Sequence, residues 1–61
     1  MFTDAEIRMV VVMLAEGNPV WYVAAQVRRH SADVERLAES YGYPDARRLR
    51  RAATRFTRAA A

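Results

Sequence analysis

Arginine is the residue type in this chain whose number and placement could do chemistry. The 61 residues include ten arginines and no lysine, and the net charge is +3 at pH 7. Residues 44–61 hold six of the arginines against one acid, Asp45, whereas residues 1–27 hold one arginine against three acids. A guanidinium group presents fixed N–H donors that match phosphate oxygens. This concentration of positive charge at one end therefore favours a polyanion as the partner.

Groups that could perform catalysis are few. The sequence has no cysteine and one histidine, His30, which excludes a disulfide framework and a Cys/His zinc site. It also lacks a nucleophile–base pair, a glycine-rich phosphate loop and a cluster of carboxylates. We therefore expect a binding protein rather than an enzyme, with no metal and no cofactor.

The apolar segments are too short for a membrane span. The longest unbroken apolar run is Met9–Ala15, whereas a transmembrane helix needs ~20 residues. Asp4 and Glu6 precede that run, which is unlike a secretory signal. The sequence thus predicts a cytoplasmic protein with no membrane partner.

Helices must position the arginines, and the boundaries of the first helix are marked. Thr3 and Glu6 have the spacing of a capping box, and Gly17 is typical of a left-handed helix end. Between them, four apolar residues recur at helical spacing. This inward-facing set is Ile7, Val10, Val11 and Leu14.

Three further helices follow by the same signs. Asn18 is the predicted N-cap of the second helix, with Pro19 at its first position, and Ser31 is the predicted N-cap of the third. Gly42 should end the third helix, and Pro44–Asp45 should open the fourth. The inward-facing residues of these helices are Val20, Val23, Ala24 and Val27; then Val34, Leu37, Ala38 and Tyr41; and then Leu49, Ala52, Ala53 and Phe56.

No segment alternates between polar and apolar residues as a strand would. We therefore expect one all-α domain spanning residues 1–61, with three to four helices and no β-wing. The arginines of residues 45–58 should cover the outer faces of a basic C-terminal helix.

The middle of the chain resembles a known family. Residues 17–27 are similar to the first helix of a helix-turn-helix unit, in which a small residue such as Ala24 lets two helices cross closely. The segment that ends in Gly42-Tyr43-Pro44-Asp45 resembles small helix-turn-helix DNA-binding proteins of actinobacteria and their phages. The family's apolar core falls here on Val20, Val23, Val27, Val34 and Leu37.

The resemblance implies a helix-turn-helix core at about residues 18–41 and a transcriptional regulator that binds double-stranded DNA as a homodimer. The turn and the outer face of the third helix would contact DNA, and the C-terminal arginines would contact phosphates. These candidate DNA-contacting residues are Arg28, Arg29, His30, Ser31, Arg36, Arg47, Arg48 and Arg51.

Two features of the chain differ from the family pattern. Arg28-Arg29-His30 stands where a glycine usually makes the turn, so an arginine must adopt a strained conformation. The outer face of the third helix carries Asp33, Glu35 and Glu39, whose carboxylates would be repelled by phosphates although they could accept a hydrogen bond from cytosine.

A protein interface is the alternative prediction. Met9, Val12 and Met13 give the first helix a second apolar face, which indicates self-association or docking on another protein. Trp21 lies one position off the inward stripe of the second helix, where it could anchor a partner or cover the core edge, and we favour the core edge. The alternative function is a small protein-binding module, for example a phage product that docks on a host protein through the first helix and Trp21.

Overall fold

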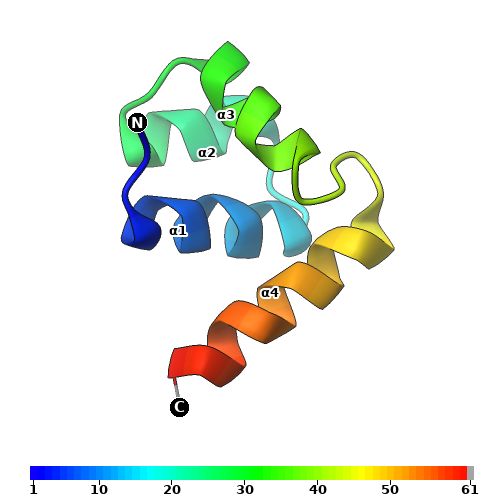
Figure 1. The fold of residues 1–61 in the computed structure, drawn as a ribbon. Helices are drawn as coiled ribbons and strands as arrows, with labels where there is room; N and C mark the ends of the chain where they lie inside the picture. Colours follow the sequence, from blue (N-terminus) through cyan, green and yellow to red (C-terminus); the bar gives the residue numbers. More distant parts are fainter. Residues whose placement is uncertain (61) are drawn as a thin grey trace.

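The computed structural model describes the backbone of residues 1–60 and the side chains of residues 1–58. Within that part of the chain there are four helices and no strand: α1 (Asp4–Ala15), α2 (Val20–Val27), α3 (Ser31–Glu39) and α4 (Ala46–Ala60) (Figure 1). The predicted all-helical fold is confirmed.

The capping box of α1 forms as predicted. The Thr3 hydroxyl accepts a hydrogen bond from the Glu6 amide at 3.1 Å, and the Glu6 carboxylate accepts one from the Thr3 amide at 2.8 Å. At the other end Gly17 has a φ of 97°. The Gly17 amide donates to the Leu14 carbonyl and the Asn18 amide donates to the Met13 carbonyl, which is the Schellman pattern of a helix end.

Asn18 was expected to cap α2, and this prediction is wrong. Its side-chain amide donates to the Met13 carbonyl at 2.9 Å, so Asn18 completes the end of α1. The N-cap position of α2 belongs to Pro19, which makes no side-chain cap. The reason is competition between two helix ends only a few residues apart, because the unsatisfied carbonyls of α1 lie within reach of Asn18.

The turn between α2 and α3 uses an arginine in a left-handed conformation. Arg28 has φ 56° and ψ 48°, and the amides of Arg28 and Arg29 both donate to the Ala24 carbonyl. This conformation costs an arginine more than a glycine. The prediction of Ser31 as N-cap is wrong by one residue: α3 begins at Ser31, and His30 occupies the cap position in an extended conformation without a side-chain cap.

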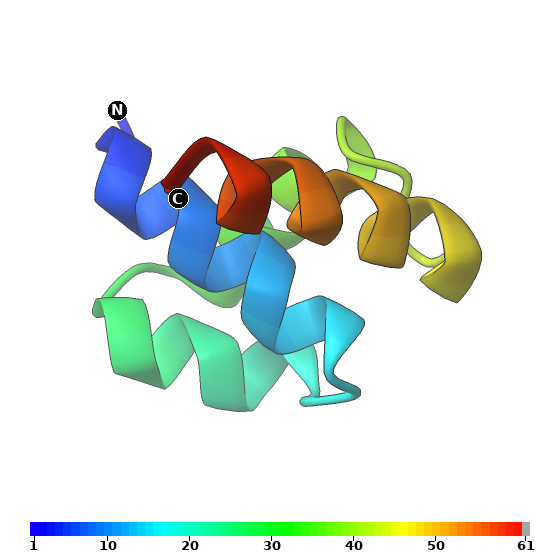
Figure 2. The same ribbon diagram turned by 90° about the horizontal axis from the view of Figure 1, so that it is seen from below.

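The core is made by the predicted inward-facing residues. Val10 and Leu14 of α1 pack with residues from all three other helices, and α1 lies between α2 and α4 (Figures 1 and 2). Val11 and Ala52 are buried outside this main cluster, and α1 and α4 are in direct contact. The remaining members of the cluster are Val23, Ala24, Val27, Val34, Ala38 and Leu49.

Gly42 and Asp45 direct the chain from α3 into α4. Gly42 has a φ of 111°, and a turn of residues 40–44 follows the last helical residue, Glu39. The Asp45 carboxylate accepts hydrogen bonds from the amides of Arg47 and Arg48, so Asp45 caps α4 and the helix starts at Ala46.

Gly42 and Gly17 form a matched pair for a stability test. A Cβ on Gly42 would lie 2.5 Å from the Cβ of Arg48, whereas a Cβ on Gly17 would meet nothing within 4 Å. We expect Gly17→Ala to cost about 1 kcal/mol of unfolding free energy, from backbone strain alone. Gly42→Ala should cost about 2–3 kcal/mol, because Arg48 must also move. Thermal melts of both variants measure the difference, and equal shifts would contradict this account of Gly42.

Candidate nucleic-acid interface

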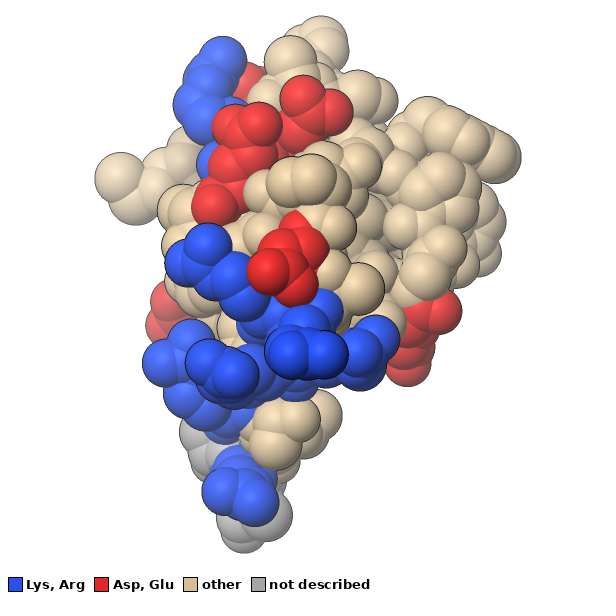
Figure 3. Space-filling model, turned by 90° about the vertical axis from the view of Figure 1, so that its right-hand side faces the viewer, with Lys and Arg blue, Asp and Glu red and all other residues tan. Residues whose placement is uncertain are grey.

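Six arginines make the outer surface of α4. Leu49 and Ala52 bury one side of the helix, which leaves the arginine positions facing solvent. Figure 3 shows basic side chains gathered in a band across the lower part of the molecule, with one further basic side chain set apart below the band. The exposed set, called here the α4 arginine face, is Arg47, Arg48, Arg50, Arg51, Arg55 and Arg58.

Among the described side chains, none of these six arginines forms an ion pair. The two ion pairs present join Arg29 to Glu6 and Arg36 to Asp33. Acidic side chains gather above the arginine band in Figure 3, but none lies within ion-pair distance of an α4 guanidinium. The arginines of α4 therefore present their N–H donors to solvent.

A hollow lies between the end of α3 and one side of α4. It has a volume of about 370 Å³ and is lined by Ser40, Tyr41, Arg48, Arg51 and Arg55. The Ser40 hydroxyl donates to the Leu37 carbonyl at 2.6 Å. Ser40, Tyr41 and Arg55 were not among the predicted site residues. The sequence signal for this hollow is the spacing of three and four residues between its arginines.

Arg29 has a structural role. Its guanidinium forms an ion pair with Glu6 at 2.9 Å, donates to the Met1 carbonyl at 3.1 Å and lies over the Phe2 ring, 4.9 Å from the ring centroid. The pKa of the Glu6 carboxyl is lowered, first because the Thr3 amide donates to it and then because Arg29 does. These contacts fasten the N-terminus to the α2–α3 turn, so we leave Arg29 out of the candidate interface.

The other predicted DNA-contacting residues of the turn and α3 are exposed. Arg28, His30 and Ser31 lie together at the start of α3. Arg36 is exposed and its guanidinium lies 3.5 Å from the Asp33 carboxylate. Glu35 and Glu39 are exposed on the same helix, so the outer face of α3 carries more acids than bases.

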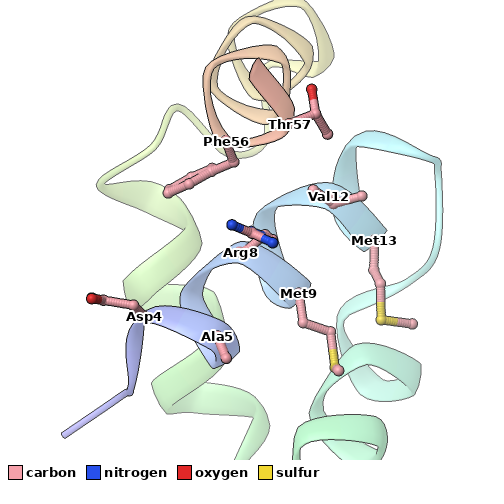
Figure 4. A pocket seen from close by; sticks show the side chains of 8 residues that line it. All are labelled: Asp4, Ala5, Arg8, Met9, Val12, Met13, Phe56 and Thr57. Carbon is pink, nitrogen blue, oxygen red and sulfur yellow. The ribbon is translucent and has the colours of Figure 1, made fainter. Parts of the chain in front are cut away.

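An apolar groove lies between α1 and α4, with a volume of about 790 Å³. Met9, Val12 and Met13 line it from α1, and Phe56 and Thr57 line it from α4 (Figure 4). Met9 is 44% exposed, whereas Met13 is half-buried and packs against the core. The second apolar face predicted for the first helix is therefore only partly open to solvent.

Trp21 does not cover the core edge. Its side chain is 69% exposed and makes an edge-to-face contact with Tyr22, at 5.9 Å between the ring centroids. The favoured interpretation of Trp21 is therefore wrong. Trp21 is not among the partly buried side chains that pack against the core cluster.

Similarity to known proteins gives no indication of the function of this chain. No family model, curated protein or solved structure matches this chain. In the part of the chain that the structure describes, no helix has the length and apolar character needed to cross a membrane. What the structure defines is a four-helix domain with one strongly basic helix face.

Proposed function

We propose that this protein binds double-stranded DNA and acts as a transcriptional regulator, with the α4 arginine face supplying most of the affinity. The observation that carries the proposal is the set of six exposed arginines on one helix, without a carboxylate partner among the described residues. Neutralising phosphates releases the counterions condensed on DNA, and this release drives binding. A helix surface of unpaired guanidinium groups suits that task.

The paired helices α2 and α3 support the same proposal. They are joined by a turn of only three residues, Arg28, Arg29 and His30, as in a helix-turn-helix unit. The exposed Arg28, His30 and Ser31 at this turn are available for contacts to the DNA backbone, and Arg36 for a contact to a base. The acids of α3 oppose deep insertion into a DNA groove, so α4 supplies most of the affinity and α3 has only a secondary role.

Titration of random duplex DNA at several salt concentrations tests the proposal. We expect binding at low salt, with the logarithm of the affinity falling linearly as the logarithm of salt concentration rises. The slope should be about −0.9 for each neutralised phosphate, so three to six contacts give a slope of roughly −3 to −5. Fluorescence anisotropy measures both quantities. The absence of binding at micromolar protein in low salt would overturn the proposal.

Self-association through the α1–α4 groove is a second part of the proposed function. Besides its apolar side chains, the groove is lined by Asp4 and Arg8, one helical turn apart (Figure 4). Both are exposed, and neither forms an ion pair within the described residues. A second copy related by a two-fold axis, with its α1 antiparallel to the first, would set each Asp4 against the other copy's Arg8.

Such a dimer leaves the DNA-binding surface free. The groove lies on the side of α4 that faces α1, whereas the hollow lined by Arg48, Arg51 and Arg55 lies on the side that faces the end of α3. Two copies would therefore present two α4 arginine faces to one duplex. Sedimentation of the wild type is the test: a concentration-dependent species of about twice the chain's mass is expected, and a monomer at every concentration would contradict it.

A further inference from the structure

We propose that the hollow between α3 and α4 binds one phosphate group of the DNA backbone and so fixes where the backbone lies on the protein. This inference rests on the proposed DNA binding and adds a defined phosphate site to it. The other arginines of α4 would then contribute diffuse attraction, whereas this site would hold one phosphate in a particular position.

The positive wall of the hollow comes from one side of α4. Arg48, Arg51 and Arg55 are separated by three and four residues, so their side chains project from the same side of the helix. The end of α3 forms the opposite wall through Ser40 and Tyr41. A water molecule occupies about 30 Å³ in the liquid, so the hollow of about 370 Å³ has room for a phosphate group with several waters.

The last three carbonyl groups of α3 already accept hydrogen bonds. The C-terminal end of a helix usually repels anions, because its last carbonyls point outward without partners. Here the Leu37 carbonyl accepts from the Ser40 amide and hydroxyl, and the Ala38 carbonyl accepts from the amides of Tyr41 and Tyr43. The Glu39 carbonyl likewise accepts from the Gly42 amide. These hydrogen bonds reduce the negative partial charge that the C-terminal end of α3 would otherwise present to a phosphate.

The available donors are the three guanidinium groups and the Tyr41 hydroxyl. The guanidinium groups form no ion pair, and the Tyr41 hydroxyl makes no hydrogen bond, within the described residues. The Ser40 hydroxyl is already engaged with Leu37, so it shapes the wall without donating into the hollow. Hydrogen bonds from charged donors to a phosphate are stronger than those between neutral groups.

Two members of the site are held in place before any ligand arrives. The Tyr41 ring packs against Phe56 at 5.7 Å between the centroids and is half-buried. The stem of Arg48 lies over Gly42, close enough that a Cβ there would meet its Cβ, Cδ and Nε atoms. A site with fixed side chains loses less conformational entropy on binding than a flexible one.

The chain offers a matched pair of triple variants to test the phosphate site. One variant changes Arg48, Arg51 and Arg55 to Gln, and the control changes Arg47, Arg50 and Arg58 to Gln. Both remove three positive charges from the exposed surface of the same helix, so diffuse attraction falls equally. We expect the first variant to lose roughly tenfold more affinity for duplex DNA than the control, because charge-assisted hydrogen bonds are lost as well.

A second arm isolates the tyrosine hydroxyl. Tyr41→Phe keeps the ring against Phe56 and should weaken DNA binding roughly three- to tenfold, the net effect of one hydrogen bond that competes with water. The same change added to the Arg48/Arg51/Arg55 variant should have no further effect, whereas in the control triple it should keep its full effect. Circular dichroism verifies that every variant is folded.

The outcomes separate the two proposals. Equal losses in both triple variants, with an unaffected Tyr41→Phe protein, would overturn the phosphate site and leave the proposed DNA binding standing. A wild type that does not bind DNA at low salt would overturn the proposed function itself.

Discussion

Val23→Asp should unfold the domain. Val23 is fully buried in the main cluster, which also contains residues of α1 and α3. No buried polar or charged side chain lies within the described core, so an aspartate there would find no partner. Burying an unpaired carboxylate costs several kcal/mol even after relaxation. That cost is comparable with the whole stability of a small domain, about 5 kcal/mol at the lower end.

The small size of the domain increases the expected effect of Val23→Asp. A domain of about 60 residues buries only ~60% of the surface that its unfolded chain exposes, so it has little stability to spare. Far-ultraviolet circular dichroism and a thermal melt measure the outcome: the wild type should melt cooperatively, and the variant should lose most of its helical signal at 25 °C.

Ala25→Asp is the matched control for this experiment. Ala25 lies two residues further along α2 and is exposed. The same carboxylate placed there stays hydrated, so the cost should be about 0.5–1 kcal/mol, from lower helix propensity and from a negative charge near the C-terminal end of α2. A helical, cooperatively melting Val23→Asp protein would mean that α2 is rotated relative to the packing described above.

The buried positions could be predicted because helix spacing alone decides them. Each buried apolar residue of the core belongs to a run with neighbours three or four positions away, and a helix places such residues on one side. The face on which the core lies follows from the sequence in this way. The capping box and the left-handed glycines could be predicted for the same reason, since they depend on residues within one turn of each other.

The N-cap residues of α2 and α3 could not be predicted from spacing. Neighbouring backbone groups compete for the same side chains, and the sequence does not show which group is nearer. Asn18 has a helix end on each side, and its side chain bonded the carbonyl of Met13 rather than an amide of α2. Which group lies closer depends on the backbone of Gly17, and sequence spacing does not contain that information. Ser31 shows the same limit: the chain passes from the left-handed Arg28 to an extended His30, which takes the cap position that the spacing assigned to Ser31.

Tertiary contacts gave different roles to residues of one type. Arg28 and Arg29 are neighbours in the sequence, yet Arg29 pairs with Glu6, which is 23 positions away, while Arg28 is exposed. The hollow beside α4 has the same origin. The spacing of Arg48, Arg51 and Arg55 is visible in the sequence, but the approach of Tyr41 depends on the turn through Gly42 and Asp45.

Val12→Arg should convert a dimer into a monomer. Val12 lines the apolar groove between α1 and α4, and self-association there would bring the arginines of two copies together on an apolar surface. Burying unpaired like charges costs several kcal/mol, which is enough to abolish a modest dimer. Ala25→Arg adds the same charge at an exposed site outside the groove and should remain dimeric. Sedimentation of the three proteins measures the change.

Val12 is half-buried, so a variant that fails to fold needs a substitute. Met9→Arg serves this purpose, because Met9 lines the same groove and is 44% exposed in the single chain. It should stay folded and become monomeric.

Either monomer should also bind duplex DNA roughly 100-fold more weakly, because two linked binding surfaces reinforce each other through effective concentration. A monomeric variant with unchanged DNA affinity would contradict this coupling.

Exchanging the charges of residues 4 and 8 tests the two-fold arrangement itself. Asp4→Arg should weaken the dimer, because each new arginine would face the other copy's Arg8, and Arg8→Asp should do the same with two acids. The double variant restores opposite charges across the axis, so it should recover most of the dimer. Recovery requires that residues 4 and 8 meet each other across the interface, since a second copy bound in another orientation would gain nothing from the exchange. A double variant that dimerises no better than the single variants would overturn the antiparallel pairing of α1. A wild type that stays monomeric would overturn self-association altogether.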